Sequence, residues 1–299
     1  MKASTAALLL GAASQALAYN IHSSCDCGDH RADIKSAMEE AKAVLNWSSL
    51  TGTACAMWER MHETGDEPVS MYETCKDQGR RSILDDFLGD HSATAYEAIA
   101  NALGPASKVP GAYSESVDGL TIVCGDSHLK KITTGVYRDQ DRGYADVRYN
   151  PAPGPNQSPC DVVQATAYKA QGKDVIMLCN RDNTGVNQPA TFSQLNTGNV
   201  QNKGVDILSK TISSIFTHEL IHTGDFDQFP RSLGDGTSEQ YEYAGCKGLA
   251  SSDLKWKNCD TFAIIARVFY LNNYYSKDGV LRVLPNSNRP KVPNGPPNQ

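Results

Sequence analysis

The sequence predicts an α+β fold that is held together by disulfide bonds, and three observations support this prediction. Apolar residues recur at helical spacing in segments on both sides of the middle of the chain. The middle itself contains β-branched or alternating runs bounded by Gly, Pro and Asp, which is typical of strands. Nine cysteines are spread along the chain. No shift in composition marks an internal boundary, so we expect one domain over residues 19–284.

Residues 1–18 are typical of a secretory signal peptide. Lys2 precedes an apolar stretch from Ala6 to Ala13, and Ala16-Leu17-Ala18 has the small residues of a cleavage site. We therefore expect a secreted, extracellular protein. The apolar stretch is too short to cross a bilayer, so we expect no membrane span.

Two helices are expected before the middle of the chain. In residues 30–46 apolar side chains recur at helical spacing, at Ile34, Met38, Ala41 and Leu45. Residues 92–103 form the second helix, with Ser92 as its N-cap. Gly104-Pro105 is expected to end this helix.

The middle of the chain is expected to form strands over residues 120–124, 161–169 and 175–179. Residues 150–159, with four prolines, and residues 181–204, rich in Asn, Gln, Gly and Thr, are expected to be loops.

Two further helices follow the loops. The stronger covers residues 206–223, and its apolar stripe runs from Leu208 to Leu220. Gly224 is expected to be its C-cap. The last helix covers residues 260–272. Residues 285–299 are rich in proline and are expected to form a disordered tail.

The cysteines favour disulfides over a cysteine-based metal cluster. Cys25 and Cys27 are separated by one residue, and no second close pair completes a zinc knuckle. Behind a secretion signal, cysteines form a disulfide framework. Because nine is an odd number, at least one thiol is left without a partner in the chain. The sequence does not give the connectivity.

Composition and charge exclude two broad classes of protein. Hydrophobic residues make up 40% of the chain and charged residues 21%, which argues against an intrinsically disordered protein. The formal net charge of −6 argues against a generic nucleic-acid partner.

The segment His218-Glu219-Leu220-Ile221-His222 matches the pattern H-E-x-x-H inside the strongest predicted helix. Two histidines four residues apart lie on one face of a helix, so both imidazoles can bind one Zn²⁺ ion. Glu219 lies one step around the helix, where its carboxylate can take a proton from a water molecule on the metal. The alternative is a helix that carries two exposed histidines. We expect one zinc ion per chain.

A catalytic zinc site needs a third protein ligand and one open position. The sequence after the helix contains no nearby third histidine, so a carboxylate is expected there. The acidic residues in this stretch are Asp225, Asp227, Asp235, Glu239 and Glu242.

Several segments resemble the aspzincin metallopeptidases, the fungal deuterolysin-like and lysine-specific group. Members combine H-E-x-x-H with a downstream G-T-x-D-x-x-Y-G segment that supplies an Asp ligand, and Gly236-Thr237-Ser238-Glu239 is similar to its start. They also carry an N-A-D-S-Y-like segment at the start of the last helix. Here that segment is Asn258-Cys259-Asp260-Thr261-Phe262. The resemblance covers most of residues 21–275.

The resemblance implies a zincin-like fold, in which a twisted sheet lies over an active-site helix, and it implies roles for particular residues. The Asp ligand position holds Glu239, or Gln240 if the alignment shifts by one; Glu242 and Asp235 remain alternatives. Tyr243, or Tyr241, would stabilise the oxyanion. Asp260 would face the substrate pocket, and its alternative role is to be the N-cap of the last helix.

Two functions follow as hypotheses. The first is a secreted zinc endopeptidase that hydrolyses a protein or peptide substrate, with Glu219 as the base. The second is a catalytically impaired relative, a secreted zinc-binding or surface-interaction protein on the same fold. The altered ligand segment favours the second hypothesis and the intact Glu219 favours the first. The sequence does not give the oligomeric state.

Overall fold

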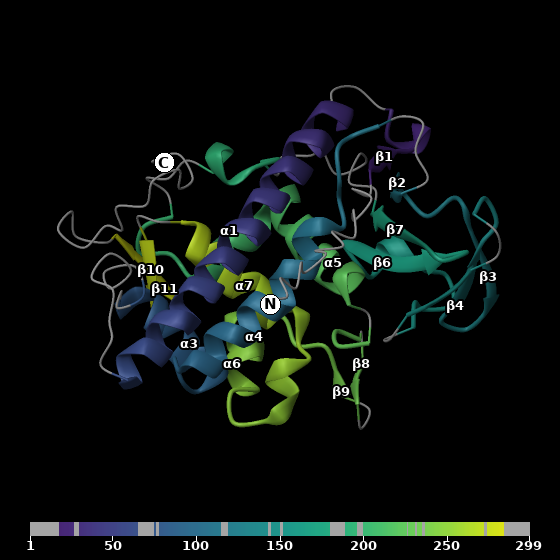
Figure 1. Cartoon of the computed structure of the whole chain (residues 1–299). Helices are drawn as coiled ribbons and strands as arrows, with labels where there is room; N and C mark the ends of the chain where they lie inside the picture. Colours follow the sequence, from purple (N-terminus) through teal and green to yellow (C-terminus); the bar gives the residue numbers. More distant parts are fainter. Residues whose placement is uncertain are drawn as a thin grey trace, which may run out of the picture.

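The computed structural model describes residues 18–26, 30–64, 75, 78–114, 119–142, 145–149, 152–179, 189–195, 200–225, 227–230, 232–234, 237–271 and 274–283. Most of the predicted signal peptide, the predicted tail and Asp235 lie outside these ranges. Within them the fold is a mixture of helices and small sheets, which confirms the α+β prediction (Figure 1). The helices are α1 (His30–Thr64), α3 (Gln78–Leu88), α4 (Ala93–Lys108), α5 (Ile212–Gly224), α6 (Glu242–Gly248) and α7 (Cys259–Tyr270).

The main sheet has four strands in the order β1-β2-β7-β6. Its parallel pairs are β1 with β2 and β2 with β7, whereas β6 lies antiparallel to β7 at the edge. Gln171 and Gly172, which both have positive φ, make the tight turn between β6 and β7. The four strands are β1 (Tyr19–Ile21), β2 (Leu120–Cys124), β6 (Ala165–Ala170) and β7 (Lys173–Leu178).

Three smaller sheets, all antiparallel, complete the strands. The largest has the order β3-β4-β5, and the others are the hairpins β8-β9 and β10-β11. Their strands are β3 (Leu129–Thr133), β4 (Val136–Asp139), β5 (Ala145–Arg148), β8 (Ser232–Gly234), β9 (Thr237–Ser238), β10 (Tyr274–Lys277) and β11 (Val280–Val283).

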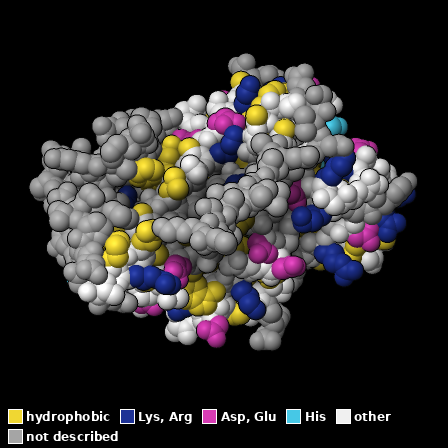
Figure 2. All heavy atoms as spheres, viewed as in Figure 1, with side chains coloured by type: hydrophobic (Ala, Val, Ile, Leu, Met, Phe, Trp, Pro, Cys, Tyr) yellow, Lys and Arg dark blue, Asp and Glu magenta, His cyan; other side chains and the backbone are white. Residues whose placement is uncertain are grey.

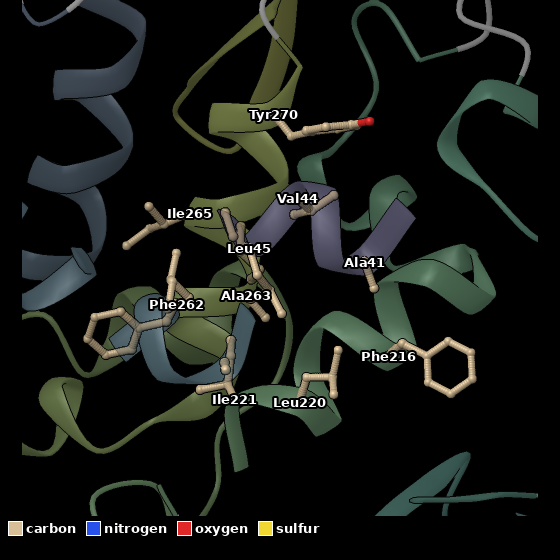
Figure 3. Close-up of a cluster of buried hydrophobic side chains, with 14 of the residues drawn as sticks. Ala41, Val44, Leu45, Phe216, Leu220, Ile221, Phe262, Ala263, Ile265 and Tyr270 are labelled. Atoms are coloured by element: carbon tan, nitrogen blue, oxygen red, sulfur yellow. The ribbon is translucent and has the colours of Figure 1, made fainter. Parts of the chain in front are cut away.

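Helix α5 lies between the other helices and β6 (Figure 1). Its apolar side chains meet those of α1 and α7, and Figure 3 shows Leu45, Ile221 and Ala263 together in this cluster. All three side chains are fully buried. A second apolar cluster, which includes Val123, Tyr137 and Met177, joins the main sheet to the β3-β4-β5 sheet. Because α5 is packed on both sides, the position of its backbone is fixed, and so are the Cβ positions of its buried side chains.

Gly224 is the last residue of α5 and does not cap it; the cap is Asp225. A Cβ atom at Gly224 would lie 2.7 Å from the backbone nitrogen of Ala106 in α4. The glycine is therefore needed for the close contact between α4 and α5, and the prediction that it caps the helix is wrong.

Four other element boundaries differ clearly from the sequence prediction, and the largest difference is that the helix expected over residues 30–46 continues to Thr64 as α1. Helix α4 continues through Gly104-Pro105 to Lys108, because Pro105 and Asn101 lie on the exposed side, where water reaches the Asn101 carbonyl that the proline leaves without a donor. The expected strand over 161–169 begins only at Ala165, since Pro159–Asp161 forms a 3₁₀ turn with a capping box. The helix expected over 206–223 is split at Thr211, which follows a 3₁₀ helix and caps α5 through Ser214 N–H.

The expected disulfides are present. The pairs are Cys25–Cys124, Cys55–Cys75 and Cys160–Cys179. Cys246 and Cys259 are buried free thiols, and Cys27 lies outside the described ranges.

Among the described residues, no helix has both the length and the apolar character that a membrane crossing requires. Acidic and basic side chains intermingle on the face that Figure 2 shows.

Candidate metal centre

Helix α5 places His218 and His222 side by side, as their spacing predicts. Their Nε2 atoms lie 3.2 Å apart, and both side chains are buried. The helix is fixed in this position by its Thr211 cap and by its contacts with α1, α4 and α7. The two imidazoles therefore present adjacent nitrogen atoms to one point in space.

Glu239, just after β9, brings a carboxylate to the same point. Its Oε2 lies 3.3 Å from His222 Nε2, and its Oε1 lies 3.6 Å from His218 Nε2. The following residue, Gln240, is held by two hydrogen bonds to the buried side chain of Asn258: its N–H donates to Oδ1 at 2.9 Å and its carbonyl accepts from Nδ2 at 3.0 Å. Asn258 thus fixes the segment that carries Glu239 against the start of α7.

The spacing of these three ligand atoms fits a zinc ion. Zinc binds nitrogen and oxygen at about 2.0–2.2 Å in tetrahedral geometry, so two such ligands lie about 3.3–3.6 Å apart. Glu239 Oε1 is also buried without a hydrogen-bond partner in the described part of the chain. An unpaired buried carboxylate oxygen is costly unless a cation or a donor meets it. The residues present therefore fit a bound metal.

Cys259, the first residue of α7, joins this group. One ligand atom from each of His218, His222, Glu239 and Cys259 lies within 4.8 Å of the others. The Cys259 thiol donates to the His218 carbonyl at 3.0 Å. We call these four residues the metal cluster. The sequence placed Cys259 in a disulfide framework, and its position beside Asp260 in the segment similar to N-A-D-S-Y was the only signal of another role.

The far nitrogen of each imidazole has an acceptor. His218 Nδ1 lies 3.3 Å from Asp260 Oδ1, and His222 Nδ1 lies 2.7 Å from the Phe229 carbonyl. Such partners hold the proton on Nδ1 and leave the Nε2 lone pair for a metal. Both rings are therefore oriented as metal-binding histidines require.

Asp260 lies behind His218 and does not cap α7, whose N-cap is Asn258. Its Oδ2 accepts from the Glu242 N–H at 2.8 Å, and the guanidinium of the buried Arg267 lies 3.7 Å from Oδ1. These contacts make Asp260 a positioning residue for His218. No sequence pattern predicts a role for Arg267, which is buried on α7 among mostly apolar side chains.

The metal cluster favours positive charge. Burial opposes a charged imidazole, but the neighbouring Cys259 and Glu239 raise the pKa of His222 to about 10. The pKa of His218 is raised too, against its burial, by Cys259, Glu239 and Asp260. Burial raises the pKa of Glu239, but the two histidines outweigh it and hold that pKa well below its usual range. The carboxylate of Glu239 and the two imidazoles therefore stabilise one another's charged forms.

The structure brings Tyr241 to the centre and places Tyr243 elsewhere. The Tyr241 hydroxyl donates to Glu239 Oε2 at 2.9 Å, and its ring stacks beside that of His218. The Tyr243 hydroxyl instead donates to Asp86 at 2.8 Å and accepts from Lys247. Glu242 has a φ of 60°, and α6 begins there, which turns Tyr243 toward α3.

The other sequence-predicted residues can also be placed. Glu219 follows His218 on α5 and is buried. Among the rivals of Glu239, the Gln240 amide donates to the Ser238 carbonyl, and Glu242 is exposed. Asp225 accepts from the N–H groups of Asp227 and Gln228, so it shapes the turn after α5.

A surface pocket of about 470 Å³ lies away from the metal cluster, at the edge of the main sheet. Its lining includes Asn20, Thr121 and Lys173 but none of the predicted site residues. The chemistry expected from the sequence therefore centres on α5 and not on this pocket.

No protein-family model matches the chain, and no curated protein matches it by sequence. The resemblance to aspzincin metallopeptidases therefore stays a prediction that depends on the motifs.

Proposed function

We propose that the chain is a secreted zinc endopeptidase. The observation that carries the proposal is the meeting of His218, His222 and Glu239 at ligand spacing, with a Glu239 Oε1 atom that has no hydrogen-bond partner in the described ranges. Two histidines and a glutamate are a donor set that zinc hydrolases use. The zincin-like fold and the aspzincin family belong to the same proposal.

When bound, zinc acts as a Lewis acid and makes water at the site a better nucleophile at neutral pH. Glu219, which follows the first ligand on α5, is the proposed base that accepts a proton from that water. Tyr241 is 54% exposed and lies beside His218, so its hydroxyl is the proposed donor to the peptide carbonyl oxygen.

An extended polypeptide is the proposed substrate. Strand β6 is an edge of the main sheet and contacts α5. Peptides often bind to such an edge as an added strand. This arrangement would carry the scissile bond past the end of α5 that holds the histidines.

Glu219→Gln tests the proposed role of the base. Glutamine has nearly the same shape but does not accept the proton, so we expect a zinc content equal to that of the wild type and a loss of peptide hydrolysis of about 100-fold or more. The measurements are elemental analysis and a fluorogenic peptide assay with and without a chelator. Glu242→Gln, at an exposed acid, is the matched control. Equal hydrolysis by Glu219→Gln and wild type would remove Glu219 from the mechanism.

A zinc-binding protein with little peptidase activity is the second candidate. The observation that favours it is the sulfur of Cys259 beside the three ligands. A zinc endopeptidase would bind zinc stoichiometrically and show peptide hydrolysis that a chelator stops. The second candidate would bind the same amount of zinc without that hydrolysis.

A further inference from the structure

We infer that Cys259 is the fourth protein ligand of the metal, so that two imidazoles, a carboxylate and a thiolate close the resting centre. This inference rests on the metal site of the proposed function. It goes beyond that function because it assigns a resting state in which the position for water is occupied by this chain's own sulfur.

The position of the sulfur is the first argument. Zinc binds thiolate at about 2.3 Å, which puts a sulfur ligand about 3.6 Å from a nitrogen ligand in a tetrahedral site. The four ligand atoms already lie within 4.8 Å of one another. A shift of the sulfur by about 1 Å, within reach of a rotation about the Cα–Cβ bond, brings it into the shell.

The second argument is that Cys259 has no disulfide partner among the cysteines that the structure describes. It is fully buried, and it is not in a disulfide although three other pairs have formed. Its hydrogen bond goes to the carbonyl of His218, which places the sulfur against the turn of α5 that carries the first ligand. A free thiol in this position faces two imidazole nitrogens and a carboxylate.

Cys246 provides an internal comparison. It is also buried and free, but its sulfur contacts the Gln240 carbonyl at 3.6 Å and Asp260 Oδ2 at 3.9 Å. It does not belong to the metal cluster. Both thiols are buried and neither is in a disulfide. What distinguishes them is the distance of each sulfur from the other ligand atoms.

A fourth protein ligand changes what the centre does. Zinc sites with four protein ligands are structural, whereas catalytic sites keep one position open for water or substrate. With Cys259 bound, hydrolysis is suppressed until the sulfur leaves the metal. Replacing Cys259 by a residue without a ligand atom opens that position.

The test uses the full chain loaded with zinc and, separately, with Co²⁺. In the wild type, X-ray absorption at the zinc edge should find one sulfur at about 2.3 Å, and the Co²⁺ form should show a thiolate-to-metal charge-transfer band. Cys259→Ala should lose both signals, bind zinc about tenfold or more weakly, and hydrolyse peptide faster than the wild type. Cys246→Ala should keep both signals. Cys259→Ser is a second variant with a similar shape, and circular dichroism checks that each variant is folded.

The outcomes separate this inference from the proposed function. Zinc bound by the wild type without sulfur in its shell overturns the role of Cys259 and leaves the proposed function standing. Wild-type protein that binds neither metal overturns both. A sulfur ligand in the wild type together with equal hydrolysis by wild type and Cys259→Ala overturns the suppression.

Discussion

Two buried clusters among the described residues are built around histidine, and they differ in how completely their polar atoms are paired. One is the metal cluster on α5. The other, which we call the Tyr168 network, lies between the main sheet and the β3-β4-β5 sheet and consists of His128, Asp139, Arg142 and Tyr168. Both combine imidazole with a buried carboxylate.

In the Tyr168 network the carboxylate is fully used. The Tyr168 hydroxyl donates to Asp139 Oδ2 at 2.7 Å and lies 3.0 Å from His128 Nε2. Asp139 Oδ1 accepts from the N–H groups of Asp141 and Arg142. In the metal cluster, no described residue forms a hydrogen bond with Glu239 Oε1, and two imidazole nitrogens face each other at 3.2 Å.

The two clusters also shift histidine pKa values in opposite directions. Burial lowers the pKa of His128, and the nearby Asp139 does not reverse this shift. The pKa values of His218 and His222 are raised despite burial, because Cys259 and Glu239 lie beside both imidazoles. A buried histidine beside a carboxylate does not by itself indicate a metal site. What distinguishes the metal cluster is a buried carboxylate oxygen that has no hydrogen-bond partner among the described residues.

The largest effect on zinc affinity is expected from a substitution that removes a ligand of the metal cluster. His222→Ala removes a ligand, so zinc affinity should fall by about 100-fold or more, since even residues that only support ligands cost 10–100-fold. His128→Ala is the matched control and should leave zinc affinity unchanged. Competition with a chromophoric chelator measures both. Similar losses in the two variants would show that the clusters do not differ as we argue.

An intermediate effect on zinc affinity is expected at Asp260, which contacts the His218 nitrogen that points away from the metal. Asp260→Asn keeps the shape of the side chain but weakens its hold on His218 Nδ1, so zinc affinity should fall by about 10–100-fold. The corresponding change in the other cluster, Asp139→Asn, should leave zinc affinity unchanged. The same chelator titration applies. Unaltered zinc affinity in Asp260→Asn would contradict the positioning role.

The smallest effect is expected in the Tyr168 network. Tyr168→Phe removes one buried hydrogen bond and should lower the free energy of unfolding by about 1 kcal/mol, because Arg142 still pairs with Asp139. Urea unfolding in the presence and absence of zinc measures it. The loss should be the same in both conditions. A loss that appears only with zinc would mean that this network is coupled to the metal cluster.

Local sequence patterns are enough to predict several elements of the fold and part of the candidate site. His218 and His222 were placed together because a spacing of four residues suffices on any helix. The strand at 120–124 matched β2, since its apolar run is short and is bounded by turn residues. Glu239 came from the resemblance to a ligand segment, and the structure brings it to the two histidines.

Some sequence predictions are wrong because tertiary packing outweighs the local sequence signal. Gly104-Pro105 has the composition of a helix end, but α4 continues because the proline faces outward while Ala106 packs against Gly224. In strict register the resemblance places the family tyrosine on Glu242, and a shift by one residue places it on Tyr243, with Tyr241 as the alternative. The positive φ of Glu242 and the start of α6 reverse that preference.

The sequence by itself determined the helix that presents His218, Glu219 and His222, because helical periodicity is a local property. The tertiary structure alone decided that Cys259 lies with these residues and Cys246 does not. The two thiols are alike in type, burial and lack of a disulfide. The packing of α7 against α5 brings Cys259 to the imidazoles, whereas Cys246 lies on α6. Contacts between residues about 40 positions apart leave no periodic trace in the chain.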